Sequence, residues 1–231
     1  MLIEVIAIRA EDAEAAYAGG ADRIELVSGI AEGGLTPSIG LVEAVVKTAP
    51  LPVNVMVRPH SQSFWYSEAD LSIMLRDIRA VREAGAAGIV VGVLDEYGGI
   101  DRAALERLLN AAEGLDVTFH RAFDEIADQV NALRQLAEYP QISRVLTAGG
   151  LQPAPQSADK IRQLRMAGDA LGICILGGYG LHANNIAGFV RQTGVREVHF
   201  GGGVRQAGSF KEKVDPELIR GIRELLSRLQ E

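Results

Sequence analysis

Three ionisable side chains end one apolar segment of the chain, residues 118–124, which read Thr-Phe-His-Arg-Ala-Phe-Asp. A strand buried inside a protein is expected to be nearly all apolar, so polar residues at its end need a reason. The imidazole of His120 exchanges a proton near neutral pH, and a carboxylate such as Asp124 can orient an acid or base. We therefore predict that His120 and Asp124 lie in a catalytic or binding pocket.

The same change from apolar to polar residues recurs elsewhere, at Glu25, at Arg58 after Val57, at Asp95 and at His199. Strands that carry polar groups toward their carboxyl ends are typical of the working face of an α/β barrel. Imidazole and carboxylate groups at strand ends favour acid–base chemistry, with Glu25 or His120 as general base and Asp124 or His199 orienting it.

A buried charged cluster is also predicted by strand order. Glu4 lies in the first apolar segment, Glu25 in the second, and Arg58 ends the third. Neighbouring strands would bring these two carboxylates and one guanidinium together inside the barrel mouth. Buried charges must be paired or change protonation state, so the cluster is either a polar pocket floor or a structural ion pair.

Two glycine clusters follow the last two predicted strands, as Gly-Gly-Tyr-Gly at 177–180 and Gly-Gly-Gly at 201–203. Barrels frequently bind phosphate through backbone N–H groups of these two loops, and glycine lets the backbone approach the anion. Glycine-rich turns also occur without a ligand. The long segment 201–214 is expected to form a mobile lid or a solvated loop. The predicted anion-binding residues are Gly177, Gly178, Gly201 and Gly202.

Eight short β-branched runs alternate with eight longer helical patterns, without any linker between them. This predicts an α/β fold, a (β/α)₈ TIM barrel, as a single domain over residues 1–231. A doubly wound open sheet also alternates strands and helices, but residues 9–12 lack the glycine-rich turn typical of it after the first strand. The expected strands are 2–8, 23–27, 53–57, 89–93, 117–119, 144–147, 172–176 and 197–200. The expected helices are 10–18, 38–48, 68–84, 101–112, 128–138, 157–167, 183–192 and 216–230.

Composition restricts the partners and the compartment. The formal net charge of −7, with dispersed Lys and Arg, argues against a nucleic-acid partner. No signal-peptide pattern and no run of about 18 apolar residues is present, so we expect a cytoplasmic protein without a membrane partner. The one cysteine, Cys174, lies between isoleucines and resembles a buried hydrophobe. The sequence has no Cys-x-x-Cys or His-x-x-x-His pattern, so no metal ligands are predicted from its residues.

Several segments together resemble the CutC copper homeostasis protein family. They run in order from Glu4 to about Gly203, and the two longest strings are the most specific. They read Ala-Asp-Arg-Ile-Glu-Leu at 21–26, Glu-Gly-Gly-Leu-Thr-Pro-Ser at 32–38, Val-Arg-Pro at 57–59, Tyr-Ser at 66–67, Gly-Val-Leu-Asp at 92–95, the 118–124 string, Arg-Val-Leu-Thr at 144–147 and Glu-Val-His at 197–199.

The resemblance implies a cytoplasmic (β/α)₈ barrel, a homo-oligomer with a dimer favoured, and copper homeostasis with copper binding. Many relatives carry cysteines at positions where this chain has Ile6, Val27 and Trp65, so the thiols expected to hold Cu(I) are absent. The alternative function is therefore an enzyme or binding protein for a phosphorylated or other anionic metabolite. A third alternative is a scaffold whose polar interior is structural.

The aromatic run Phe64, Trp65 and Tyr66 belongs to a long predicted loop after the third strand. Such loops commonly wall a pocket on the top face of a barrel. Packing or an oligomer interface is the other interpretation of these side chains.

Overall fold

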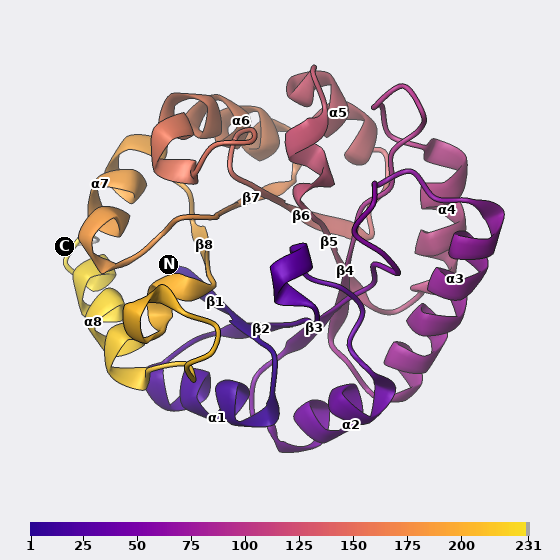
Figure 1. Ribbon diagram of the computed structural model, residues 1–231. Helices are drawn as coiled ribbons and strands as arrows, with labels where there is room; N and C mark the ends of the chain where they lie inside the picture. Colours follow the sequence, from indigo (N-terminus) through magenta and orange to yellow (C-terminus); the bar gives the residue numbers. More distant parts are fainter. Residues whose placement is uncertain (230–231) are drawn as a thin grey trace.

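A computed structural model describes residues 1–229 and shows a closed barrel of eight parallel strands in chain order. The helices surround the strands as an outer ring (Figure 1). The barrel closes where the last strand pairs with the first, with Glu4 opposite His199. The strands are β1 (Leu2–Ala7), β2 (Arg23–Leu26), β3 (Val53–Met56), β4 (Gly88–Val91), β5 (Asp116–Phe119), β6 (Ile142–Thr147), β7 (Cys174–Gly178) and β8 (Glu197–Phe200).

Each strand is followed by a helix, and the predicted (β/α)₈ fold is confirmed. Two of the predicted helices begin at capping residues. Ser67 and Asp70 form a capping box at the helix that begins with Glu68, and Asp215 caps the helix that begins with Pro216. The helices are α1 (Ala10–Gly19), α2 (Ile39–Thr48), α3 (Glu68–Glu83), α4 (Arg102–Ala111), α5 (Gln129–Leu136), α6 (Ala158–Leu171), α7 (Ala183–Thr193) and α8 (Pro216–Ser227). Short 3₁₀ turns are η1 (Ile30–Glu32), η2 (Arg121–Glu125), η3 (Ala154–Ser157), η4 (Gly202–Val204) and η5 (Gln206–Gly208).

The seventh strand lies two residues further along the chain than the sequence pattern predicts. Gly172 ends α6 in the left-handed conformation, with φ of 79°, so a strand cannot begin there. The strand β7 therefore includes Gly177 and Gly178, which were expected in the following loop. This prediction was wrong because the left-handed helix cap and the strand start look alike in sequence.

Successive side chains along each strand point alternately into two buried regions. One alternate set packs against the helices and forms the main apolar core, and the other set faces the barrel lumen. Within the lumen, a small apolar cluster of Val27, Met56 and Val90 is packed against Ile6, Ile8 and Ile30. The remaining lumen is occupied by buried charged and polar side chains.

The segment 201–214 is anchored by one fully buried arginine. Arg205 donates hydrogen bonds to both carboxylate oxygens of Asp12, at 3.2 and 2.9 Å, and to the carbonyls of Ile6 and Glu212, at 2.9 and 2.8 Å. These contacts tie the segment to α1 and to the end of β1. Residues 206–208 and 211–213 are exposed, so the solvated loop describes them, and the mobile lid stays a prediction.

Across the part of the chain that the structure covers, residues 1–229, every helix is too short or too polar to cross a membrane.

Candidate functional site

A cavity of about 950 Å³ opens at the carboxyl ends of the strands. This is the face on which α/β barrels carry their active sites. The turn η1 lies over the centre of the barrel, where it is drawn in violet (Figure 1). Of the residues predicted for the site, those that line the cavity are Glu25, Arg58, His120, Asp124, His199, Gly201 and Gly202. Those that do not line it are Glu4, Gly177 and Gly178.

His199 joins two buried carboxylates, one from β1, which pairs with β8, and one from β2, the next strand of the barrel. Its Nδ1 atom lies 2.7 Å from Oε1 of Glu4, and its Nε2 atom lies 3.8 Å from Oε2 of Glu25. Gly178 leaves room for this imidazole, because a Cβ atom there would lie 3.1 Å from two carbons of His199. The Oε1 atom of Glu25 is buried and has no hydrogen-bond partner among residues 1–229.

The two carboxylates respond to this environment in opposite ways. Burial raises the pKa of Glu25 to about 7, and the negative charge of Glu4 adds to this effect, while His199 and Arg23 oppose it. Burial would also raise the pKa of Glu4, but its hydrogen bonds and charge interactions with His199 and Arg23 lower it to about 2. Burial works against protonation of His199, yet the charges of Glu25 and Glu4 raise its pKa. Glu25 therefore titrates near neutral pH, protonated His199 is favoured, and Glu4 stays ionised.

The arginine that meets Glu4 is Arg23, not Arg58. Its Nε atom donates to Oε2 of Glu4 at 2.5 Å, and a terminal nitrogen donates to Glu197 at 2.6 Å. Arg144 extends the network, with its Nε atom 3.2 Å from the same oxygen of Glu197. Sequence reasoning missed Arg23, although its spacing of two from Glu25 on one strand places both side chains in the lumen.

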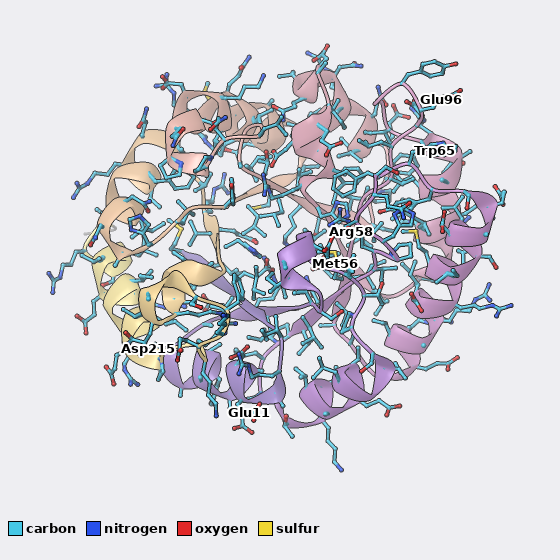
Figure 2. All side chains as sticks on the ribbon, viewed as in Figure 1. Glu11, Met56, Arg58, Trp65, Glu96 and Asp215 are labelled. Atoms are coloured by element: carbon cyan, nitrogen blue, oxygen red, sulfur yellow. The ribbon has the colours of Figure 1, made fainter. Side chains whose placement is uncertain are left out.

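Arg58 lies at the end of β3, where its guanidinium reaches the turn after β2. It donates to the carbonyls of Glu32 and Gly34 at 3.0 and 3.2 Å, and its carbon Cζ lies 4.6 Å from the ring centroid of Phe64. Its Nε atom is buried without a partner in the described chain. Figure 2 shows Arg58 and Met56 near the centre of the barrel, beside the turn η1.

The aromatic run after β3 is divided between cavity and surface. Phe64 lines the cavity, with its ring centroid 5.0 Å from that of His120. Tyr66 is buried, whereas Trp65 is 53 % exposed and lies toward the outer rim of the molecule (Figure 2). Only Phe64 is a wall of the cavity.

His120 is held as a neutral imidazole. Its Nδ1 atom accepts a hydrogen bond from the backbone N–H of Ala122 at 3.1 Å. Burial, together with the positive charges of Arg58 and Arg121, lowers the pKa of His120 to about 3. Gly92 makes room for the ring, since a Cβ atom there would lie 2.4 Å from Nδ1. The Nε2 atom is buried and has no partner within residues 1–229.

Asp124 orients an arginine rather than a histidine. It accepts hydrogen bonds from Oγ1 of Thr147 at 2.5 Å, from the backbone of Ala148 at 3.1 Å and from Nε of Arg121 at 2.7 Å. The guanidinium carbon of Arg121 lies 4.3 Å from the ring centroid of Tyr179, whose φ of 76° is unusual for a residue with a side chain. Sequence reasoning missed Arg121 as a site residue, although it stands inside the 118–124 string.

Two glycines after β8 are required by packing. A Cβ atom on Gly203 would lie 1.9 Å from the carbonyl oxygen of Leu181 in the loop after β7, and one on Gly202 would lie 2.6 Å from the carbonyl oxygen of Gly208 in its own loop. Close backbone packing therefore explains Gly202 and Gly203 without a ligand. Anion binding by the glycine loops stays a prediction.

The donor set of the cavity does not suit Cu(I). Within residues 1–229, one group has ligand atoms within 4.8 Å of one another, and it consists of Glu4, Glu25 and His199. Both oxygens of Glu4 already accept hydrogen bonds, from Arg23 and from His199, so this is a hydrogen-bonded charge cluster. Cu(I) prefers thiolates and thioethers, and Met56 supplies the single thioether in the described lining of the cavity. Burial and the nearby Glu197 raise the pKa of the Cys174 thiol to about 12, so the thiolate is disfavoured there.

Comparison with known proteins agrees with the fold. In solved structures the chain resembles the putative copper homeostasis protein CutC from Streptococcus agalactiae, with 32 % identity and a TM-score of 0.81 over 87 % of this chain and 98 % of that one. It also resembles phosphoribosyl anthranilate isomerase from Thermococcus kodakaraensis, with a TM-score of 0.63, covering 97 % of this chain and 98 % of that one. The identity there is 17 %, so this second likeness shows the barrel fold alone.

Sequence comparison is more specific. A family protein CutC from Salmonella schwarzengrund (strain CVM19633) is 44 % identical over 203 residues, which are 88 % of this chain and 80 % of the relative. The sequence profile of the CutC family matches residues 1–204. The chain belongs to the CutC family.

Proposed function

We propose that this protein binds a small anionic metabolite in the cavity and transfers a proton to or from it, with Glu25 as the acid–base group. The observation that carries the proposal is the state of Glu25: its carboxylate is buried, its Oε1 atom has no hydrogen-bond partner among residues 1–229, and burial raises its pKa to about 7. A general base works best when its pKa lies near the operating pH. Perturbed groups of this kind in a cleft are candidates for functional sites.

Two guanidinium groups support an anionic ligand. Arg58 has an unpartnered Nε atom, and Arg121 is 34 % exposed while Asp124 and Tyr179 fix its orientation. Arginine in a fixed orientation binds carboxylate and phosphate groups through parallel hydrogen bonds. Both arginines line the same cavity as Glu25.

His199 supports the acid–base role by its position between the carboxylates. Glu4 fixes the imidazole from one side, and the other ring nitrogen faces Glu25 at 3.8 Å. The pair Glu25 and His199 can therefore hold one proton in either of two places, which lets the base be reset after each transfer.

Copper is the competing proposal, because the similar protein from Streptococcus agalactiae carries the name of a copper homeostasis protein. The described lining of the cavity offers Cu(I) carboxylates, imidazoles and one thioether, from Met56, and the thiolate of Cys174 is disfavoured. We therefore favour the anionic metabolite over copper as the ligand of this cavity.

Thermal unfolding of the purified protein with a ligand panel tests both proposals. The panel consists of inorganic phosphate, sugar phosphates, small carboxylates, and Cu(I) with a reductant. A ligand at 100 times its dissociation constant adds about 2.7 kcal/mol, which corresponds to roughly 5–10 °C for a chain of this size. We expect a phosphorylated or carboxylated compound to raise the midpoint, and Cu(I) to leave it unchanged.

Variants then locate the binding. Arg58→Met removes a charge from the cavity and should abolish the rise, whereas Arg102→Met, on an exposed ion pair with Glu138, should keep it. A rise with Cu(I) alone, or a rise that Arg58→Met and Glu25→Gln both leave intact, would contradict the proposal.

A further inference from the structure

The single proton of the neutral His120 ring has a fixed place. A ring nitrogen that accepts a hydrogen bond carries no hydrogen, and Nδ1 accepts one from Ala122. The hydrogen must then be on Nε2. The tautomer follows from geometry alone: the protein presents an Nε2–H donor that has no acceptor within the described chain.

This donor is held in place on two sides. The ring of Phe64 is tilted at 54° to the imidazole with 5.0 Å between centroids, and the opposite nitrogen fills the space in which a Cβ atom on Gly92 would lie, 2.4 Å away. A buried donor without an acceptor is rare and lowers stability. A ligand oxygen that accepts from Nε2 would remove this penalty, and a neutral oxygen acceptor such as a carbonyl suits a neutral donor.

We infer that the ligand is an anionic carbonyl compound and that the protein catalyses its enolisation, with His120 donating to the carbonyl oxygen and Glu25 removing a proton from the adjacent carbon. This inference rests on the proposed function above and adds the substrate class and the reaction. It is motivated by the presence, in one cavity, of an unpartnered donor, an unpartnered carboxylate oxygen and two arginines.

The step balances within the residues of the cavity. The ionised carboxylate of Glu25 takes a proton from the carbon next to the carbonyl. The electron pair of the broken C–H bond forms a C=C bond, and the carbonyl electrons move to oxygen, giving an enolate. The N–H of His120 stabilises this oxygen without losing its proton, as an oxyanion-hole donor does. Glu25, now a carboxylic acid, returns the proton to the same carbon, and the carbonyl group is restored.

The arginines select the charged end of such a compound. A guanidinium recognises a carboxylate and a phosphate by the same parallel hydrogen bonds. Arg121 is the accessible one, since Asp124 and Tyr179 leave 34 % of its side chain exposed. The substrate class is therefore a 2-oxo carboxylate or a phosphorylated ketone, and the two are separated by which of them exchanges a proton with solvent.

Hydrogen exchange in deuterated water tests the inference directly. The protein is incubated with pyruvate and 2-oxoglutarate in one arm, and with dihydroxyacetone phosphate and ribulose 5-phosphate in the other. Proton NMR follows the signal of the C–H next to the carbonyl. We expect the signal in one arm to disappear faster than in buffer, and Glu25→Gln to return the rate to the buffer value.

Two variants of His120 distinguish loss of the hydrogen-bond donor at Nε2 from loss of the imidazole ring. The amide of glutamine reaches the position of Nε2, whereas that of asparagine reaches only the position of Nδ1. We expect His120→Asn to slow exchange by about 100-fold or more, and His120→Gln to retain most of it. Circular dichroism and the unfolding midpoint of each variant confirm that it is folded.

The outcomes distinguish this inference from the proposed function. A thermal shift with these compounds, but no exchange above buffer, overturns enolisation and leaves anion binding standing. Neither shift nor exchange overturns both. Exchange that His120→Asn leaves at the wild-type rate overturns the assigned role of His120.

Discussion

The Nδ1 atom of His199 lies 2.7 Å from Oε1 of Glu4, and the pairing of β8 with β1 places the two residues directly opposite each other. The closure of the barrel thus creates this contact. Because Glu4 stays ionised, it supplies a fixed negative charge behind the imidazole. Protonation of His199 is then linked to Glu25 on its other side.

The pH dependence of the free energy of unfolding should reveal the raised pKa of Glu25. Its folded pKa of about 7 lies above its ordinary value of 4.5, so its contribution is fully present below pH 4.5 and is lost as pH rises through 7. His199, Glu4 and Arg23 are the charged groups that affect Glu25. Glu25→Gln keeps the shape of the protonated form, so we expect it to gain about 2 kcal/mol relative to wild type between pH 5 and pH 9. Urea unfolding at several pH values measures the difference, and a constant difference would contradict the raised pKa.

Removal of the negative charge of Glu4 should change the pKa of His199. Glu4→Gln leaves Arg23 with one carboxylate partner fewer and should lower the pKa of His199, since Glu4 raises it. We expect a loss of about 3 kcal/mol in the free energy of unfolding. NMR titration of the imidazole reports the pKa. As a matched control, Glu138→Gln breaks the exposed pair with Arg102 and should cost less than about 1 kcal/mol.

Anchoring of the segment 201–214 should depend on the pair of Arg205 and Asp12, both of whose side chains are fully buried. Arg205→Met leaves an uncompensated buried carboxylate and should destabilise the fold by about 3–5 kcal/mol. The double variant with Asp12→Asn should recover a substantial part of that loss. Chemical unfolding of all three proteins measures this, and strictly additive losses would mean that the pair is not coupled.

Gly92 should be needed for the position of His120. A methyl group there would lie 2.4 Å from Nδ1 and must displace the ring, so Gly92→Ala should cost about 1–3 kcal/mol and shift the imidazole NMR signals of His120. Gly188 in α7 is the matched control, because a Cβ atom there has no neighbour within 4 Å. Gly188→Ala should be neutral or stabilising by up to about 1 kcal/mol. Equal changes in stability for Gly92→Ala and Gly188→Ala would contradict a special requirement for glycine beside His120.

Copper binding should be weak. Competition with a Cu(I) chelator under reducing conditions should reveal no tight stoichiometric site, and Cys174→Ser should change the result little because its thiolate is disfavoured. A tight site lost in Cys174→Ser would show that the thiol binds copper despite its raised pKa.

The fold was predictable because each β/α unit repeats the same local signals, such as the cap at Asp215 followed by Pro216. Placement of Glu25, His120 and His199 in the lumen also followed from alternation along strands. The pairing of Glu4 with Arg23 instead of Arg58 was not predictable. Spacing within one strand does not give the height of a side chain along the barrel axis. The register sets that height by placing Glu4 opposite Arg23.

Of two other differences, one has a local cause and the other comes from a contact that is distant in sequence. The chain after β5 coils into η2, which turns Asp124 toward Thr147 and away from both histidines. The environment of Arg121 depends on Tyr179, which is far away in sequence, so no local pattern could reveal it. The cytoplasmic location, the homodimer and the boundaries of a single domain over residues 1–231 stay predictions.

The close approach of Gly203 to Leu181 limits how this wall of the cavity can vary. A Cβ atom on Gly203 would lie 1.9 Å from the carbonyl oxygen of Leu181, so no side chain fits between the two loops. Elsewhere around the cavity, η1 lies over the barrel (Figure 1) and the ring of Phe64 packs against His120. Any reshaping of the cavity by substitution therefore falls to residues outside the glycine contact.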